Sequence, residues 1–128
     1  MNLLLDTCTF LWLTASPEKL SATARDLCRD ASNTLYLSPV STWEIILKYR
    51  LGKLPMTVAP HIFVPTQRLI HDVEELPLRE ADTLHKATLP NHHKDPFDRM
   101  LICQALEHGF TILTPDKKII AYPVATAW

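Results

Sequence analysis

The chain has 128 residues, of which 47% are hydrophobic and 21% are charged, values typical of a folded globular protein. Thirteen Lys and Arg residues against fourteen Asp and Glu residues give a formal net charge of −1. This balance excludes a polybasic, histone-like mode of nucleic-acid binding but leaves room for a local basic patch. The length predicts one domain spanning residues 1–128.

The sequence also argues against a membrane-bound or secreted protein. It contains no run of about 18 apolar residues, and the N-terminal MNLLLD has no basic residues and reaches Asp6 after three leucines. The three cysteines, Cys8, Cys28 and Cys103, are widely spaced and form no CxxC pair. They predict buried free thiols in a reducing compartment, and therefore a cytoplasmic protein, rather than a disulfide framework or a zinc site.

Short apolar runs alternate with helical patterns in the first half of the chain. We expect strands at residues 2–6 and 34–38, and helices at residues 7–15, 21–31 and 39–51. Pro39 suits the first helical position, and Gly52 ends the third of these helices.

The second half of the chain continues this alternation after a proline-rich stretch at residues 53–77, in which a helical piece near residues 61–71 is possible. We expect an amphipathic helix at residues 78–89, whose shared face carries Leu78, Ala81, Leu84, His85 and Thr88. The remaining predicted elements are a helix at 96–108, a strand at 110–114, a lysine-bearing turn and a strand near 122–125. Strands that alternate with helices predict an α/β fold with a mainly parallel sheet.

Four acidic residues fall where such a fold brings side chains together. Asp6 and Asp116 each follow a predicted strand, and ligands of open α/β sheets bind beyond these carboxyl ends. Asp98 begins the apolar stripe of the helix at 96–108, and Glu44 lies in the apolar WEIIL. Crowded carboxylates raise one another's pKa values unless a cation is bound. All-oxygen ligands favour Mg²⁺ or Mn²⁺, which can activate water for phosphodiester hydrolysis.

Each of these acids also has a purely structural interpretation. Asp6 can cap the helix that follows it, and Asp116 can be a turn residue. Glu44 fits a capping box and can pair with Lys48, four positions later. Asp98 has less to do structurally, because Asp95 is the better placed N-cap. The structural interpretations are separately reasonable, but together they require a coincidence.

Four successive motifs resemble those of PIN-domain ribonucleases, and more narrowly the VapC-type toxins of bacterial toxin–antitoxin pairs. The motifs are LLLDTCTFLW, SPVSTWEIILKYRLGKL, LPNHHKDPFDRMLICQAL and ILTPDKKI. The resemblance covers nearly the whole chain, and the HHKDPFDRML stretch is its most specific part. It implies a three-layer fold with four to five short strands, Mg²⁺-dependent cleavage of RNA, a homodimer, and an antitoxin that covers the active cleft and forms a higher assembly.

Carried over motif by motif, the resemblance assigns the same four acids to catalysis and metal binding, namely Asp6, Glu44, Asp98 and Asp116. We expect Asp6 and Asp98 to bind the metal directly, and the other two to bind directly or through water. Mn²⁺ is expected to substitute for Mg²⁺. Asp95 is an extra carboxylate whose role is either capping or a contact behind the metal ligands.

Basic residues beside these acids suggest where RNA phosphates bind. We expect a basic lip formed by His92, His93, Lys94 and Arg99, although an ordinary solvated loop is the alternative, and Arg99 can instead be a structural counter-ion. Other functions fit less well. A dehalogenase-like phosphatase needs an Asp two residues after Asp6, where Cys8 stands, and no histidine is spaced to activate a Cys8 nucleophile. The remaining rival is a catalytically inactive PIN-like module that binds protein or RNA.

Overall fold

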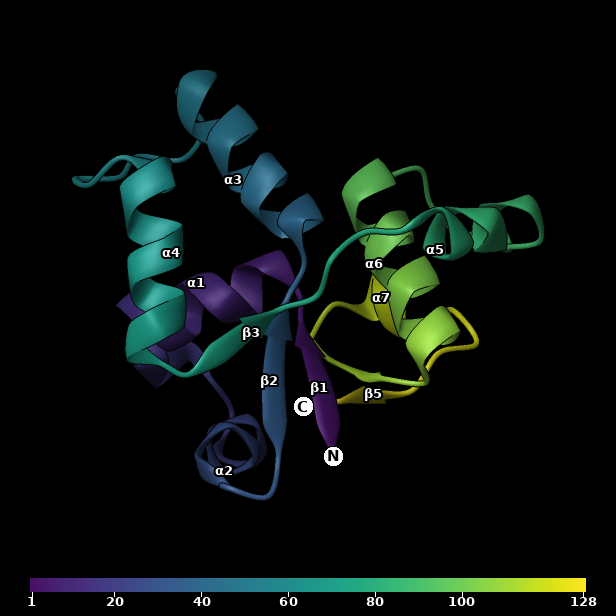
Figure 1. Ribbon diagram of the computed structural model, residues 1–128, viewed down its shortest axis with the longest axis horizontal. Coiled ribbons are helices and arrows are strands. Elements are labelled where there is room, and N and C mark those ends of the chain that lie inside the picture. The colour runs from purple at the N-terminus through teal and green to yellow at the C-terminus, as the bar shows by residue number, and fades with distance from the viewer.

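The computed structural model describes all residues, 1–128, and forms one five-stranded parallel sheet between two layers of helices (Figure 1). The strand order is β3-β2-β1-β4-β5, and every pairing is parallel. The predicted α/β fold with a mainly parallel sheet is confirmed. The strands are β1 (Asn2–Leu5), β2 (Thr34–Leu37), β3 (Val73–Glu75), β4 (Thr111–Leu113) and β5 (Thr126–Ala127).

Strand β1 lies at the centre of the sheet and fixes its two faces. Leu3 and Leu5 point into one hydrophobic cluster and Leu4 into the other, as the two-residue period of a strand requires. All three side chains are fully buried. The continuous apolar run of β1 is therefore explained by burial of the strand on both faces of the sheet.

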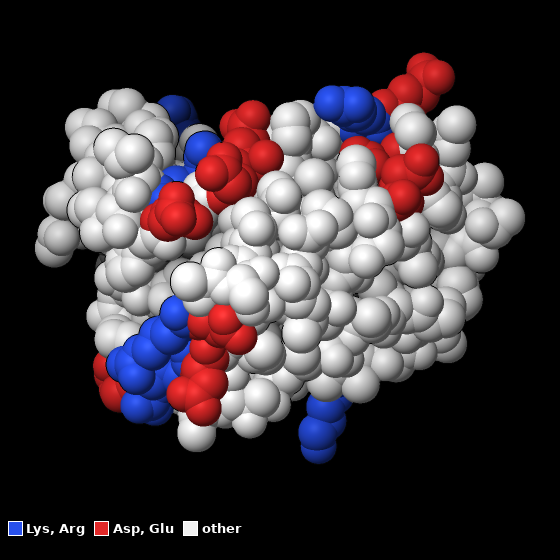
Figure 2. Space-filling view, turned by 60° about the horizontal axis from the view of Figure 1, so that its bottom comes forward, with Lys and Arg blue, Asp and Glu red and all other residues white.

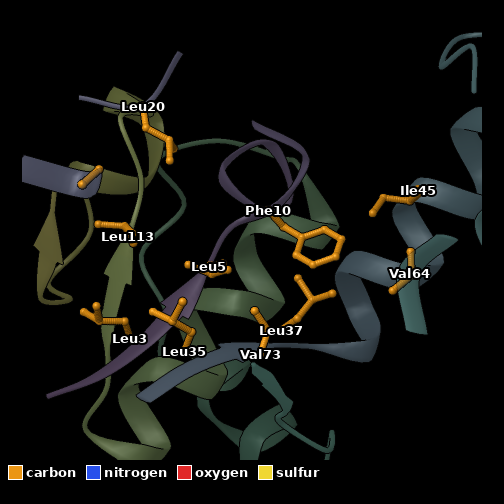
Figure 3. Packing of buried hydrophobic residues seen from close by; sticks show 11 residues of the cluster. Leu3, Leu5, Phe10, Leu20, Leu35, Leu37, Ile45, Val64, Val73 and Leu113 are labelled. Carbon is orange, nitrogen blue, oxygen red and sulfur yellow. The ribbon is translucent and has the colours of Figure 1, made fainter. Parts of the chain in front are cut away.

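One face of the sheet is covered by helices from the first half of the chain. Phe10, Ile45 and Val64 bring their helices against the strand residues Leu37 and Val73, as Figure 3 shows. The elements of this layer are α1 (Thr7–Ala15), the 3-10 helix η1 (Pro17–Lys19), α2 (Ala22–Arg29), α3 (Pro39–Arg50) and α4 (Pro60–Ile70).

The opposite face is covered by the C-terminal helices. Leu101, Ile102 and Ala105 of α6 pack with Ile119 of α7 against Leu4 and Ile112. The elements on this side are α5 (Glu80–Leu84), the 3-10 helix η2 (His85–Ala87), α6 (Pro96–His108) and α7 (Lys117–Ile120). Gly109 ends α6 with φ of +67°, in the left-handed region that favours glycine. No helix is both long enough and apolar enough to cross a bilayer.

The sequence expectation for residues 78–89 is wrong. The predicted helix at 78–89 is split into α5 and η2, and two leucines of its supposed apolar face, Leu78 and Leu84, are exposed. The side that is buried carries Asp82 instead, whose carboxylate accepts from the backbone N–H of Arg79 and lies 3.0 Å from His108 Nε2. The buried side of this segment is therefore formed by Asp82, an acid that caps α5, and not by the expected apolar residues.

The edges of the sheet also differ from expectation. Strand β3 lies within the proline-rich stretch, where no strand is predicted, and it pairs with β2 through Leu35 and Val73. The last strand is Thr126–Ala127 rather than a segment near 122–125, because Tyr122 is instead buried against α6. The lysine-bearing turn forms the short helix α7. All three cysteines are free, with Cys103 buried and the other two half-buried.

Candidate active site

A pocket of about 360 Å³ opens where the carboxyl ends of β1 and β4 meet α1, the middle of α3 and the first turn of α6. It contains all four acids singled out from the sequence, together with Asp95 and two lysines. The strand order reverses at this point, since β1 pairs with β2 on one side and β4 on the other. The lining residues are Asp6, Thr7, Cys8, Leu11, Glu44, Ile45, Lys48, Lys53, Leu54, Asp95, Asp98 and Asp116.

Asp6 is the most firmly held of the acids. Its side chain is buried and caps α1, with Oδ1 accepting from the backbone N–H of Thr9 at 2.8 Å. The hydroxyl of Thr114, the residue after β4, donates to Oδ2. Thr114 also accepts from the backbone N–H of Asp116 at 3.0 Å. One hydroxyl thereby joins the acids that follow the two central strands. Asp6 does serve as an N-cap, and it lines the pocket as well.

Glu44 reaches the pocket from the second turn of α3 and is 4% exposed. Oε1 accepts a hydrogen bond from the hydroxyl of Thr7 at 2.6 Å, and Oε2 forms an ion pair with Lys48. The capping-box alternative is wrong, because the N-cap of α3 is Ser38, whose hydroxyl accepts from the backbone N–H of Val40, and Glu44 takes no part in the cap. The ion-pair alternative is confirmed, and the bond to Glu44 raises the pKa of Lys48.

Asp98 lies in the first turn of α6, while Asp95 caps this helix by accepting from the backbone N–H of Asp98 at 2.9 Å. Burial raises the pKa of Asp98 from 3.8 to about 6. The bond from His93 opposes this shift, and the negative charges of Asp95, Asp116 and Glu44 add to it. A carboxyl with such a pKa among other acids is typical of a site built to receive positive charge.

Asp116 is partly exposed and caps α7, with Oδ1 accepting from the backbone N–H of Lys118 at 2.9 Å. Its second carboxylate oxygen has no protein donor among the hydrogen bonds of the structure. The turn-like role expected as the alternative therefore coexists with a place in the pocket.

Two cations, Lys48 and Lys53, also line the pocket, and sequence reasoning did not single out Lys53. It follows Gly52, which has φ of +73° and turns the chain back after α3. A lysine directly after the glycine stop of an acid-bearing helix is the signal that could have found it. These lysines provide positive charge next to the acids.

The expected basic lip is only partly present. His92 and Lys94 are exposed, whereas Arg99 is 8% exposed and its NH1 group donates to the carbonyl of Pro90 and the hydroxyl of Tyr122, both at 2.8 Å. Arg99 is thus turned into the protein and unavailable to a phosphate. Figure 2 shows small mixed groups of acidic and basic side chains separated by uncharged surface on the face in view, with no broad basic patch.

The donor set suits a hard divalent cation, and its spacing decides how such an ion is held. Besides the thiol of Cys8 and the ammonium groups of the two lysines, the polar side-chain groups that line the pocket are carboxylates and the hydroxyl of Thr7, and oxygen ligands favour Mg²⁺ or Mn²⁺ over softer metals. No three His, Cys, Asp or Glu side chains are grouped closely enough to hold an ion by themselves. Mg²⁺ typically keeps several waters and uses one or two carboxylates, so it fits this wider arrangement.

Cys8 lines the pocket, but its chemistry is unsuited to nucleophilic attack. Burial, followed by the charge of Asp6, raises the pKa of the Cys8 thiol to about 12. The thiol donates to Asp6 Oδ1 at 3.3 Å and stays protonated at neutral pH. The thiol-enzyme alternative therefore gains no support.

The family model described as PIN domain matches residues 3–124. Ribonuclease VapC22 of Mycobacterium tuberculosis is 24% identical over 92% of this chain and 89% of its own length. Ribonuclease VapC16 of the same organism is 36% identical over 48% of this chain, a match that spans only 44% of that relative. A solved structure of VapBC2 from Rickettsia felis, bound to a DNA fragment from its promoter, superposes with a TM-score of 0.71. That structure covers 99% of this chain and 98% of its own, at 14% identity.

Proposed function

Because the chain belongs to the PIN domain family and is related to VapC ribonucleases, we propose that it is a Mg²⁺-dependent endoribonuclease that acts as the toxin of a toxin–antitoxin pair. The observation that carries this proposal is the convergence of Asp6, Glu44, Asp98 and Asp116 on one pocket. These residues belong to four separate parts of the fold. Asp6 and Asp116 cap helices, whereas Glu44 and Asp98 do not, so capping does not explain why all four acids line one pocket.

Each acid has a proposed part in holding the cation. Asp6 and Asp98 are the direct ligands, since they line the pocket from the end of β1 and from the first turn of α6. Glu44 and Asp116 bind directly or through water. A divalent ion in this pocket supplies a Lewis acid that makes water nucleophilic and neutralises charge on phosphoryl oxygens. Mn²⁺ is expected to replace Mg²⁺.

The remaining side chains orient the site and its substrate. Asp95 holds the first turn of α6, and so Asp98, by capping the helix. Lys53 and the exposed Lys94 offer positive charge to RNA phosphates, and the exposed His92 lies in the same loop as Lys94. Thr7 and Thr114 hold Glu44 and Asp6 through their hydroxyls.

The proposed partners follow from the same relationship. The similarity to a VapBC structure supports a cognate antitoxin that covers the pocket and a larger assembly formed with it. We expect the toxin itself to be a homodimer in this assembly.

Cleavage of a synthetic single-stranded RNA and of total cellular RNA, with Mg²⁺ or with EDTA, tests the proposed activity. The wild-type protein should cut with Mg²⁺ only, Asp6→Asn and Asp98→Asn should be inactive but folded, and Asp26→Asn should match the wild type. Asp26 is an exposed acid on α2, outside the pocket, and serves as the matched control. Absence of cleavage by folded, Mg²⁺-bound protein would favour the inactive binding module instead.

A further inference from the structure

A chain of hydrogen bonds runs from the buried guanidinium of Arg99 to the carboxylate of Asp98, although no hydrogen bond or ion pair joins these two side chains directly. Arg99 NH1 donates to the hydroxyl of Tyr122 at 2.8 Å. The same hydroxyl lies 2.8 Å from His93 Nδ1, and His93 Nε2 lies 3.1 Å from Asp98 Oδ2. His93 is therefore placed between a buried hydroxyl and an acid of the pocket.

The donors and acceptors around the Tyr122 hydroxyl determine the direction of these hydrogen bonds. Its oxygen already accepts from Arg99 NH1 and, at 3.1 Å, from the backbone N–H of His93. A phenolic oxygen has two lone pairs and one proton, so a third N–H donor has no lone pair left to bind. The hydroxyl proton must then go to an acceptor. The nearer one is His93 Nδ1 at 2.8 Å, compared with the His93 carbonyl at 3.4 Å.

This arrangement determines which ring nitrogen of His93 carries a proton. With Nδ1 accepting from Tyr122, a neutral imidazole has its proton on Nε2. Nε2 then donates to Asp98 Oδ2, and it is the only side-chain donor to that carboxylate. Oδ1 of Asp98 is left without a protein donor.

The environment keeps Tyr122 in place. The Tyr122 side chain is 3% exposed. The His92 ring packs against the Tyr122 ring in a T-shaped arrangement at a centroid distance of 4.8 Å, and the Arg99 guanidinium lies 5.9 Å from the Tyr122 ring centre. Arg99 is in turn anchored by the carbonyl of Pro90 at 2.8 Å. The hydroxyl is thus held by contacts that do not depend on Asp98.

We propose that His93 is a positioning residue: Tyr122 and Arg99 hold its proton on Nε2, and the resulting bond to Oδ2 orients Asp98 so that Oδ1 is left to face a cation. The proposal rests on the proposed function, and it replaces the expectation that His93 contacts RNA phosphates. Outer hydrogen bonds of this kind, to metal-binding side chains, commonly change metal affinity by roughly 10–100-fold.

The tautomer can be measured directly on the wild-type, metal-free protein. Long-range ¹H–¹⁵N correlation spectra at pH 8 distinguish a protonated ring nitrogen from a bare one, and the signals missing from a His93→Gln variant identify His93. We expect a neutral ring with a bare Nδ1 and a protonated Nε2. A proton on Nδ1, in a neutral or a charged ring, would overturn the proposal.

Two substitutions of His93 distinguish a role of its hydrogen bond to Asp98 from a role in packing alone. In His93→Gln the amide nitrogen lies near the former Nε2 and can still donate to Asp98. In His93→Asn it lies near the former Nδ1 and can reach only Tyr122. We expect Mn²⁺ affinity, measured by calorimetry, to stay within about threefold of wild type for Gln and to fall roughly tenfold or more for Asn.

Equal affinities for the Gln and Asn variants would overturn the positioning role. The corresponding changes at His61, an exposed residue on α4, are the matched controls and should leave affinity unchanged. Should the Asn variant not fold, the tautomer of the wild type still decides the proposal. If the wild-type protein binds no divalent ion, the proposed function fails, and the spectra show separately whether His93 donates to Asp98.

Discussion

The hydroxyl of Thr114 donates a hydrogen bond to the carboxylate of Asp6, joining residues that lie 108 positions apart in the sequence. Both side chains are buried, and each directly follows one of the two central strands. The parallel pairing of β1 with β4, in the register Leu5 to Leu113, is what brings them together. The most buried acid of the candidate site is therefore positioned by the sheet itself.

We predict that Thr114→Val destabilises the protein by about 1–3 kcal/mol, because a buried carboxylate loses a donor while the shape of the side chain is kept. RNA cleavage should fall by at least roughly tenfold, since Asp6 is then less well oriented. Urea unfolding and initial cleavage rates measure the two effects. Thr111→Val, in the strand that precedes Thr114 but half-buried and without a side-chain hydrogen bond, is the control. A variant indistinguishable from this control would show that the bond does not matter.

Ionisation of Asp98 should lower the free energy of unfolding of the metal-free protein. Its folded pKa of about 6 exceeds its ordinary value of 3.8, so the folded protein binds this proton more tightly than the unfolded chain does. The corresponding stability is fully present below about pH 4 and is lost as the pH rises through 6. Above that pH the cost reaches up to about 3 kcal/mol for a shift of this size.

Asp98→Asn should therefore be more stable than the wild type in EDTA at pH 8, and the difference should shrink as the pH is lowered toward 4. Urea unfolding at several pH values measures it. Asp26→Asn on the surface of α2 serves as the reference for removing one negative charge. An Asn variant that is less stable than the wild type at pH 8 would contradict the interpretation that Asp98 is held at an energetic cost.

Lys48 should act as an internal counter-ion of Glu44. Lys48→Met removes the ion pair and is expected to destabilise the metal-free protein by about 1 kcal/mol, since Lys48 is half exposed while Glu44 is buried. With less positive charge in the pocket, added Mg²⁺ should raise the Tm of the variant more than that of the wild type. Calorimetric scans with and without Mg²⁺ measure this, and the double variant with Glu44→Gln should cancel most of the destabilisation. A smaller Mg²⁺ response in Lys48→Met would contradict this role.

The cysteines should be slow to alkylate in the folded protein. Burial raises the pKa of Cys8 to about 12 and that of Cys28 to about 11, so very little thiolate is present at pH 8. Iodoacetamide labelling followed by mass spectrometry should show rates at least about tenfold lower in native than in urea-unfolded protein. Rapid labelling of Cys8 in the native state would reopen the thiol-enzyme alternative.

The positions of the acids can be anticipated from the sequence because they depend on local order. Asp6 and Asp116 follow apolar runs, and Asp98 follows an N-cap and a proline, Asp95 and Pro96. Once the strands are parallel, the carboxyl ends that carry these residues must share one edge of the sheet. Side chains with local signals were therefore placed correctly in the pocket.

Features that depend on contacts distant in sequence were missed. Strand β3 has one buried residue, Val73, and is defined only by its pairing with β2, so it leaves no periodic signal. The hydroxyl of Thr114 and the buried position of Arg99 depend on partners that are not sequence neighbours. The exposed face of α5 was misjudged because Asp82 is buried through its bond to the Arg79 backbone, a contact that hydrophobic periodicity ignores.

Diffraction from crystals grown with Mn²⁺ tests most directly whether the gathered carboxylates form a divalent cation site. An anomalous difference peak is predicted inside the pocket, within ligand or water-bridged distance of Asp6 and Asp98, and absent from crystals of Asp98→Asn grown in the same way. Mn²⁺ found only elsewhere on the surface, with the pocket free of anomalous signal at saturating concentration, would contradict the account.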